Sequence, residues 1–139
     1  MTTFQRPSIT LAAAQRMVQA ALLEAEGRAM HIAVVVVDES GRLKAFARMD
    51  AAPLVATDAA RKKAVTAVGF GLETGPPWHD FIKGDPILAG GAPQLKDFIL
   101  LGGGIPVVVD GAICGAIGVA GGHYEQDTAC ARAGISALS

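Results

Sequence analysis

The chain has 139 residues, of which 51% are hydrophobic and 18% are charged, with a formal net charge of -1. This length suits one domain covering residues 1–139. The even charge balance, without a basic cluster, argues against a nucleic-acid partner, and no apolar run is long enough to cross a membrane. The opening MTTFQRPSIT lacks the basic start and apolar core of a signal peptide, which predicts a cytoplasmic protein.

The first half of the chain alternates helical and strand patterns. Apolar residues recur with helical spacing from Thr10 to about Gly27, which predicts an amphipathic helix with Thr10 as its N-cap. The β-branched run His31–Val37 predicts a buried strand, and Arg42–Asp50 alternates with period two, as its hairpin partner would. A second long helix is expected over Pro53–Gly71, with alanines along one face.

The middle of the chain is rich in glycine and proline. The segment Gly71–Ala92 contains the only tryptophan, Trp78, and offers at most a short helix around Trp78–Lys83. Irregular segments of this length are often lids, ligand walls or interface arms. A short strand is then predicted over Phe98–Leu101.

The last third predicts a β-hairpin followed by a helix. Ile105–Val109 and Ala112–Ala120 read as strands, and Asp110-Gly111 between them is typical of a tight turn that needs positive φ. A final helix is expected from His123 to the C-terminus. Together with Phe98–Leu101, these segments predict an α/β (α+β) fold with a central antiparallel β-sheet of about five strands flanked by helices.

Two runs of glycine flank this hairpin, one before its first strand and one after its second. In an antiparallel hairpin these positions are neighbours in space. Backbone without side chains can approach a ligand closely, and the adjacent helix N-terminus favours anionic groups. We therefore predict a ligand pocket bordered by Gly103, Gly104, Gly121 and Gly122.

The apolar composition also predicts a homo-oligomer, because a small domain can cover excess apolar surface at subunit interfaces. Neither Cys114 nor Cys130 belongs to a CxxC pair, and both are interpreted as reduced core residues.

Several stretches together resemble a known family. They are TLAAA in the first helix, AVVVVDESGRL across the first hairpin, RMD and AP before RKKAVTA, and GGGIPVVVDGAICGAIGVAGG followed by EQD. On these residues the chain resembles the GlcG/HbpS family, which also forms the C-terminal domain of PduO-type proteins. The resemblance covers nearly the whole chain and implies a profilin-like fold and compact oligomers, often octamers. Several members bind haem, and PduO-type relatives are associated with corrinoid metabolism.

Three histidines are candidates for a ligand site, although none has the paired spacing of a zinc site. Haem iron can take a single axial histidine. His123 is the best placed, at the glycine-rich junction of strand and helix, and it is followed by Tyr124 where relatives carry small or proline-rich residues. His79 adjoins Trp78, and the two could line one cavity. His31 begins a buried strand and is interpreted as structural, a role that stays open for all three histidines.

Four charged residues form a second candidate site. Arg48 and Asp50 share one face at the end of a predicted strand, Lys63 lies within the alanine stripe of the following helix, and Asp127 lies in the first turn of the last helix. One interpretation is a structural ion-pair cluster, within the chain or across a subunit interface. The other is a binding site in which Arg48 or Lys63 receives a carboxylate, such as a haem propionate or a small organic acid.

Three functions fit these observations. The leading hypothesis is a small-ligand-binding protein of the GlcG/HbpS type that takes haem or another tetrapyrrole or corrinoid. The second is a catabolic enzyme for a compact organic acid or carbonyl compound, with Lys63 or His123 as acid–base group and Arg48 as anchor. The third is an accessory subunit that serves assembly and binds no ligand.

Overall fold

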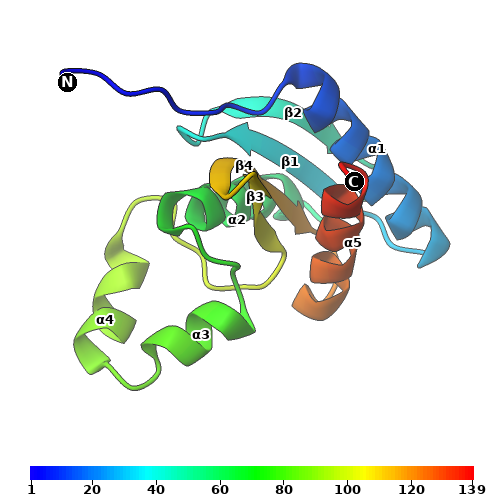
Figure 1. Cartoon of the computed structure of the whole chain (residues 1–139). Coiled ribbons are helices and arrows are strands. Elements are labelled where there is room, and N and C mark those ends of the chain that lie inside the picture. The colour runs from blue at the N-terminus through cyan, green and yellow to red at the C-terminus, as the bar shows by residue number, and fades with distance from the viewer.

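The structure, a computed structural model, describes residues 1–139 as one antiparallel sheet with helices on both faces (Figure 1). None of its helices is both long and apolar enough to cross a bilayer. The elements in chain order are α1 (Leu11–Gly27), β1 (Ala33–Asp38), β2 (Leu43–Arg48), α2 (Ala56–Phe70), α3 (Pro76–Ile82), α4 (Pro86–Gly91), the 3₁₀ turn η1 (Ala92–Gln94), β3 (Gly104–Val109), β4 (Ala112–Ala120) and α5 (Tyr124–Ser136).

The sheet has four strands in the order β2-β1-β4-β3, so the predicted number of five is wrong. The strand expected at Phe98–Leu101 is absent because its backbone groups bond elsewhere. The amide of Ile99 donates to Thr66 Oγ1 at 3.0 Å, and the carbonyl oxygen of Leu100 accepts from the Gly75 amide at 2.6 Å. This segment is therefore fastened between α2 and the start of α3 and adds no strand to the sheet.

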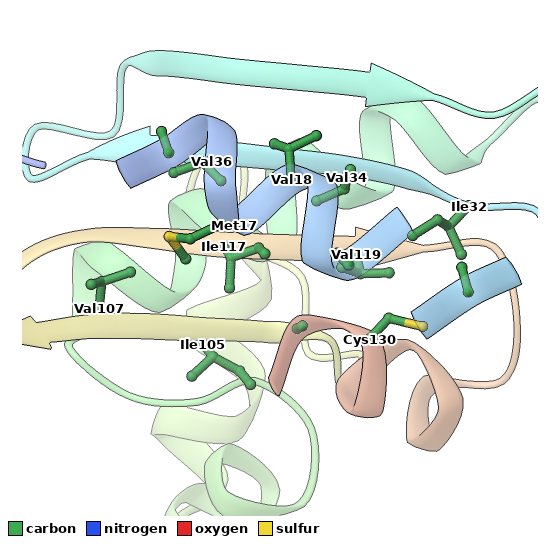
Figure 2. Close-up of a cluster of buried hydrophobic side chains, with 14 of the residues drawn as sticks. Met17, Val18, Ile32, Val34, Val36, Ile105, Val107, Ile117, Val119 and Cys130 are labelled. Carbon is green, nitrogen blue, oxygen red and sulfur yellow. The ribbon is translucent and has the colours of Figure 1, made fainter. Parts of the chain in front are cut away.

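The larger core lies between one face of the sheet and the pair α1 and α5 (Figure 2). Thr10 caps α1 as predicted, with its side chain accepting from the Ala13 amide at 3.1 Å. Met17 and Val18 of α1 then face the strands, where they meet β-branched residues that alternate inward with period two. The labelled members in Figure 2 are Met17, Val18, Ile32, Val34, Val36, Ile105, Val107, Ile117, Val119 and Cys130.

The opposite face of the sheet is covered by α2 through a stripe of alanines, as predicted. Small side chains let the helix backbone approach the sheet closely. The approach is tightest at Gly118 of β4, where an added Cβ atom would clash with the Ala60 carbonyl oxygen and lie 2.6 Å from the Ala64 amide nitrogen. The cluster on this face contains Ala33, Val35, Val37, Ala56, Ala60, Ala64, Ala67, Ala116 and Ala120.

The segment between α2 and β3 is more ordered than the sequence predicted. It contains α3, as expected, and also α4, which the glycine and proline content concealed. Asp85 starts α4 as its N-cap, accepting from the amides of Ile87 and Leu88 at 3.0 and 3.1 Å, with Pro86 at the first helical position. Figure 1 shows α3 and α4 projecting from the body of the molecule as an arm. The arm has a small core of its own, formed by Trp78, Ile82 and Ala92.

A substitution at Gly118 tests the close contact between α2 and the sheet. Gly118→Ala should destabilise the fold by about 2 kcal/mol or more, because neither backbone can retreat without breaking hydrogen bonds. The matched control is Gly69→Ala in α2, which has nothing within 4 Å of the added Cβ and should gain up to about 1 kcal/mol of helix propensity. Urea unfolding measures both variants, and a Gly118→Ala protein as stable as the wild type would contradict the packing described.

Candidate functional site

The two glycine runs do meet, at the end of the sheet where α5 begins. Gly104 of β3 pairs with Gly118 of β4, and the Gly103 carbonyl oxygen accepts from the Val119 amide at 3.0 Å. Asp127 stands between the runs. A Cβ atom on Gly103 would lie 3.1 Å from Asp127 Cβ, and the Gly122 amide donates to Asp127 Oδ1 at 2.8 Å. The predicted adjacency of the runs is thus confirmed.

The room predicted between the glycine runs is filled by the protein's own side chains. Lys63 of α2 extends into it, and its Nζ donates to Asp127 Oδ2 and to the Val119 carbonyl oxygen, both at 2.9 Å. A Cβ on Gly103 would lie 3.1 Å from Lys63 Cδ, so the missing side chain is what admits the lysine. The expectation of an open pocket at this corner is therefore wrong, because the alanine-stripe lysine and the first-turn aspartate meet there.

The Lys63–Asp127 pair is almost completely withdrawn from solvent, with each residue 2% exposed. Burial lowers the pKa of Lys63 and raises the pKa of Asp127, while the attraction between the two opposes both shifts. Hydrogen bonds from Gly122 and to Val119 complete the shell of each group, which is what a buried ion pair requires. Since neither group lines any of the four cavities described below, the pair is positioned as a structural link between α2 and α5.

The other two charged candidates lie elsewhere. Arg48 and Asp50 border a hollow of about 310 Å³ formed by the loop from Arg48 to Leu54, ahead of α2. Neither residue takes part in a salt bridge. The structure therefore divides the predicted cluster of four into a buried pair and an exposed strand end.

Two further cavities lie away from every predicted site residue. One, of about 610 Å³, lies between the N-terminal segment at Phe4–Pro7 and the β3–β4 turn. The other, of about 350 Å³, is a groove between α1 and β2.

The fourth cavity, of about 310 Å³ and open to solvent, lies between the arm and the start of α5. We call it the arm cavity. Most of its surface is apolar, and the only polar side chains that border it belong to His79 of α3 and Tyr124 of α5. Its lining residues are Gly75, Pro76, His79, Leu100, Leu101, Gly102 and Tyr124.

Two ion pairs fix the arm beside α5 and α2. Arg132 of α5 contacts Glu73, just ahead of α3, at 2.7 Å. Arg61 of α2 contacts Asp97, beyond η1, at 3.0 Å, and this guanidinium lowers the pKa of the Asp97 carboxyl. Both ends of the arm are thereby tied to the body of the molecule, and the cavity lies at the joint.

Of the predicted aromatic and histidine candidates, only His79 reaches the arm cavity. Its side chain is 61% exposed, with Nδ1 3.9 Å from Asp80 Oδ1. Trp78 points the other way, into the arm's core, where it is 1% exposed and packs edge-on against Phe70 and Phe98. Its indole Nε1 has no hydrogen-bond partner. The expectation that Trp78 and His79 line one cavity is therefore not met.

His123 is the N-cap of α5, and its Nδ1 accepts from the Glu125 amide at 3.2 Å. The ring lies against Tyr124, with centroids 4.2 Å apart. It borders none of the four cavities, and neither does the exposed His31. Sequence reasoning did not select Tyr124 as a site residue, although its departure from the family pattern marked the position.

The sequence of this chain matches a known protein family. A family model described as haem degrading protein, HbpS-like, matches residues 9–136. The chain belongs to the HbpS-like family.

Relatives of this HbpS-like chain match it over almost its whole length. A 15.0 kDa protein from the dhaT-dhaS intergenic region of Citrobacter freundii is 34% identical over 137 residues, covering 97% of this chain and 95% of that protein. A crystal structure of a Streptomyces reticuli HbpS double mutant has a TM-score of 0.89 at 33% identity, covering 99% and 91% of the two chains. A crystal structure of a PduOC:heme complex has a TM-score of 0.79 at 29% identity, covering 94% of each. The resemblance drawn from the sequence is thus confirmed at the level of the family.

The buried pair makes a clear prediction for stability. Lys63→Met leaves a buried carboxylate without its cation and should cost about 3–5 kcal/mol, whereas adding Asp127→Leu should recover most of that loss. The measurement is urea unfolding of the wild type, both single variants and the double variant near neutral pH. A double variant whose loss equals the sum of the two single losses would show that the pair is not coupled.

The same variant should respond to pH. Without Lys63, which opposes the effect of burial, the pKa of Asp127 in the folded state rises further. A carboxyl group with a raised folded pKa adds stability at low pH and loses that contribution as the pH rises through the folded value. The stability gap between Lys63→Met and wild type should therefore be smaller at about pH 5 than at about pH 8. A gap that is constant over this range would contradict the prediction.

Proposed function

We propose that this protein binds a tetrapyrrole, with haem as the first candidate, in the arm cavity. The observation that carries the proposal is a histidine, His79, on the wall of a cavity that is otherwise largely apolar. Two comparisons support it: the match to a family model described as haem degrading, and the similarity to a solved complex of PduOC with heme. Haem proteins commonly hold the iron by one axial histidine within apolar surroundings.

The residues of the arm cavity suit such a ligand. Leu100, Leu101 and Pro76 supply apolar contacts for a macrocycle, and His79 supplies a nitrogen for iron. A volume of about 310 Å³ is at the lower end of the usual range for ligand sites, so a macrocycle would extend through the open side into solvent. Bound haem would bring redox chemistry at its iron, while the chain itself contributes the apolar walls and one ligand.

The volume of the arm cavity also suits a second candidate function. A compact organic acid or carbonyl compound fits about 310 Å³ fully, and an enzyme for such a substrate would use His79 as its acid–base group. Lys63, the acid–base lysine considered from the sequence, is buried with Asp127 and borders none of the cavities described. A third candidate is an accessory subunit without a ligand, which the corner between the glycine runs would also suit because side chains of the protein fill it.

We also propose that the protein is a cytoplasmic homo-oligomer, with the octameric assembly and the profilin-like fold that the family resemblance implies. Its support is the apolar surface left on the single chain, where Phe46, Leu54, Val55 and Val108 are all exposed. Both cysteines are free and buried, as suits a reducing compartment. Native mass spectrometry of the purified protein would report the assembly and any bound mass together.

A haem titration tests the proposed function. The wild type should give a saturable Soret shift with one site per chain, and His79→Ala should weaken binding at least tenfold through loss of the axial ligand. His31→Ala is the matched control, since His31 is an exposed histidine outside every cavity described. Absence of a saturable shift would exclude haem, and wild-type affinity in His79→Ala would contradict His79 as the axial ligand, on which the arm-cavity proposal depends.

A further inference from the structure

Tyr124 is the one phenol of the chain, and it borders the arm cavity, as does His79 of α3. None of the hydrogen bonds of the structure uses its hydroxyl group; only its backbone carbonyl is engaged, by Thr128 Oγ1 at 2.7 Å. A half-buried aromatic ring with a free hydroxyl at a cavity wall offers an apolar face and a polar tip to the same ligand.

The Tyr124 ring is held in place from two sides. Beneath it lies Gly102, where an added Cβ would come within 3.1 Å of Tyr124 Cδ2 and 3.4 Å of Tyr124 Cβ. Beside it lies the His123 ring, tilted by 34° with the centroids 4.2 Å apart. Because Gly102 also lines the cavity, the ring packs against the cavity wall at Gly102.

His123 is itself fixed by the backbone of α5. Its Nδ1 accepts from the Glu125 amide, which occupies one ring nitrogen in capping the helix. A capping bond and a ring contact with the next residue are the two interactions that the structure gives this side chain. The ring contact is the one that reaches the Tyr124 side chain.

Building on the proposed function, we infer that Tyr124 contacts the ligand of the arm cavity and that His123 acts as its positioning residue. The ligand class that fits is a flat conjugated molecule with a hydrogen-bond acceptor within reach of the phenol. The dipeptide His123-Tyr124 thereby sets what this cavity selects, and His79 meets the ligand from the arm. In this role His123 does not contact the ligand itself, in contrast to the direct contact predicted from the sequence.

The single tyrosine makes the inference directly measurable. Protein labelled with 3-fluorotyrosine should give one ¹⁹F resonance, and metal-free protoporphyrin IX should shift it in a saturable manner. Tyr124→Ala should weaken porphyrin binding about tenfold by removing the aromatic contact, and Tyr124→Phe should weaken it less, by removing the hydroxyl alone. A saturable haem Soret shift with an unmoved ¹⁹F resonance would overturn the inference and leave the proposed function standing.

The opposite combination of results also distinguishes haem binding from the ligand contact of Tyr124. If haem gives no saturable Soret shift but protoporphyrin IX moves the ¹⁹F resonance, the haem proposal fails and the assignment of Tyr124 holds. If neither ligand produces a change, both are overturned.

Two substitutions at His123 separate positioning from direct contact. His123→Asn keeps a good N-cap and removes the ring, so it should retain thermal stability but weaken porphyrin binding and move the ligand-free ¹⁹F resonance. His123→Phe keeps a ring and removes the capping acceptor, so it should recover most of the binding while lowering the melting temperature. Equal loss of binding in both variants would show that the imidazole itself holds the ligand and would overturn the positioning role.

Discussion

The buried contact between Lys63 and Asp127 governs the corner of the molecule on which the rest depends. It joins α2 on one face of the sheet to α5 on the other, so it must pass the end of β3 and β4 (Figure 1). An ammonium and a carboxylate are stable there only with further hydrogen bonds, which Val119 and Gly122 supply. The absence of a side chain at Gly103 provides the passage, so glycine and ion pair require each other.

The ion pair closes the space at Gly103, and the cavity that we propose as the ligand site borders the first glycine run only at Gly102. Gly103 faces the ion pair, whereas Gly102, its neighbour, lies under Tyr124 and lines the arm cavity. One short stretch of chain therefore serves the core on one side and the cavity on the other. A shift in the Lys63–Asp127 pair would also move the cavity wall at Gly102, because the consecutive residues Gly102 and Gly103 form the two surfaces.

Structural features that depend on local residue patterns could be predicted from the sequence, and features that depend on contacts between distant side chains could not. Period-two alternation, the Asp110-Gly111 turn and the alanine stripe gave the hairpins and α2, and a lysine inside that stripe indicated a buried partner. Whether the glycine corner was open depended on how far Lys63 reaches, which spacing alone does not determine. Phe98–Leu101 has a strand-like composition, but its partners are Thr66 and Gly75.

The arm cavity lies where the arm is attached to the body of the molecule. The arm has a separate core around Trp78, and its ends are tied to the body by the Glu73–Arg132 and Arg61–Asp97 pairs. Partly exposed ion pairs of this kind contribute little stability individually. A ligand bound as we propose, against His79 on the arm and Tyr124 on the body, would add a further link between the two.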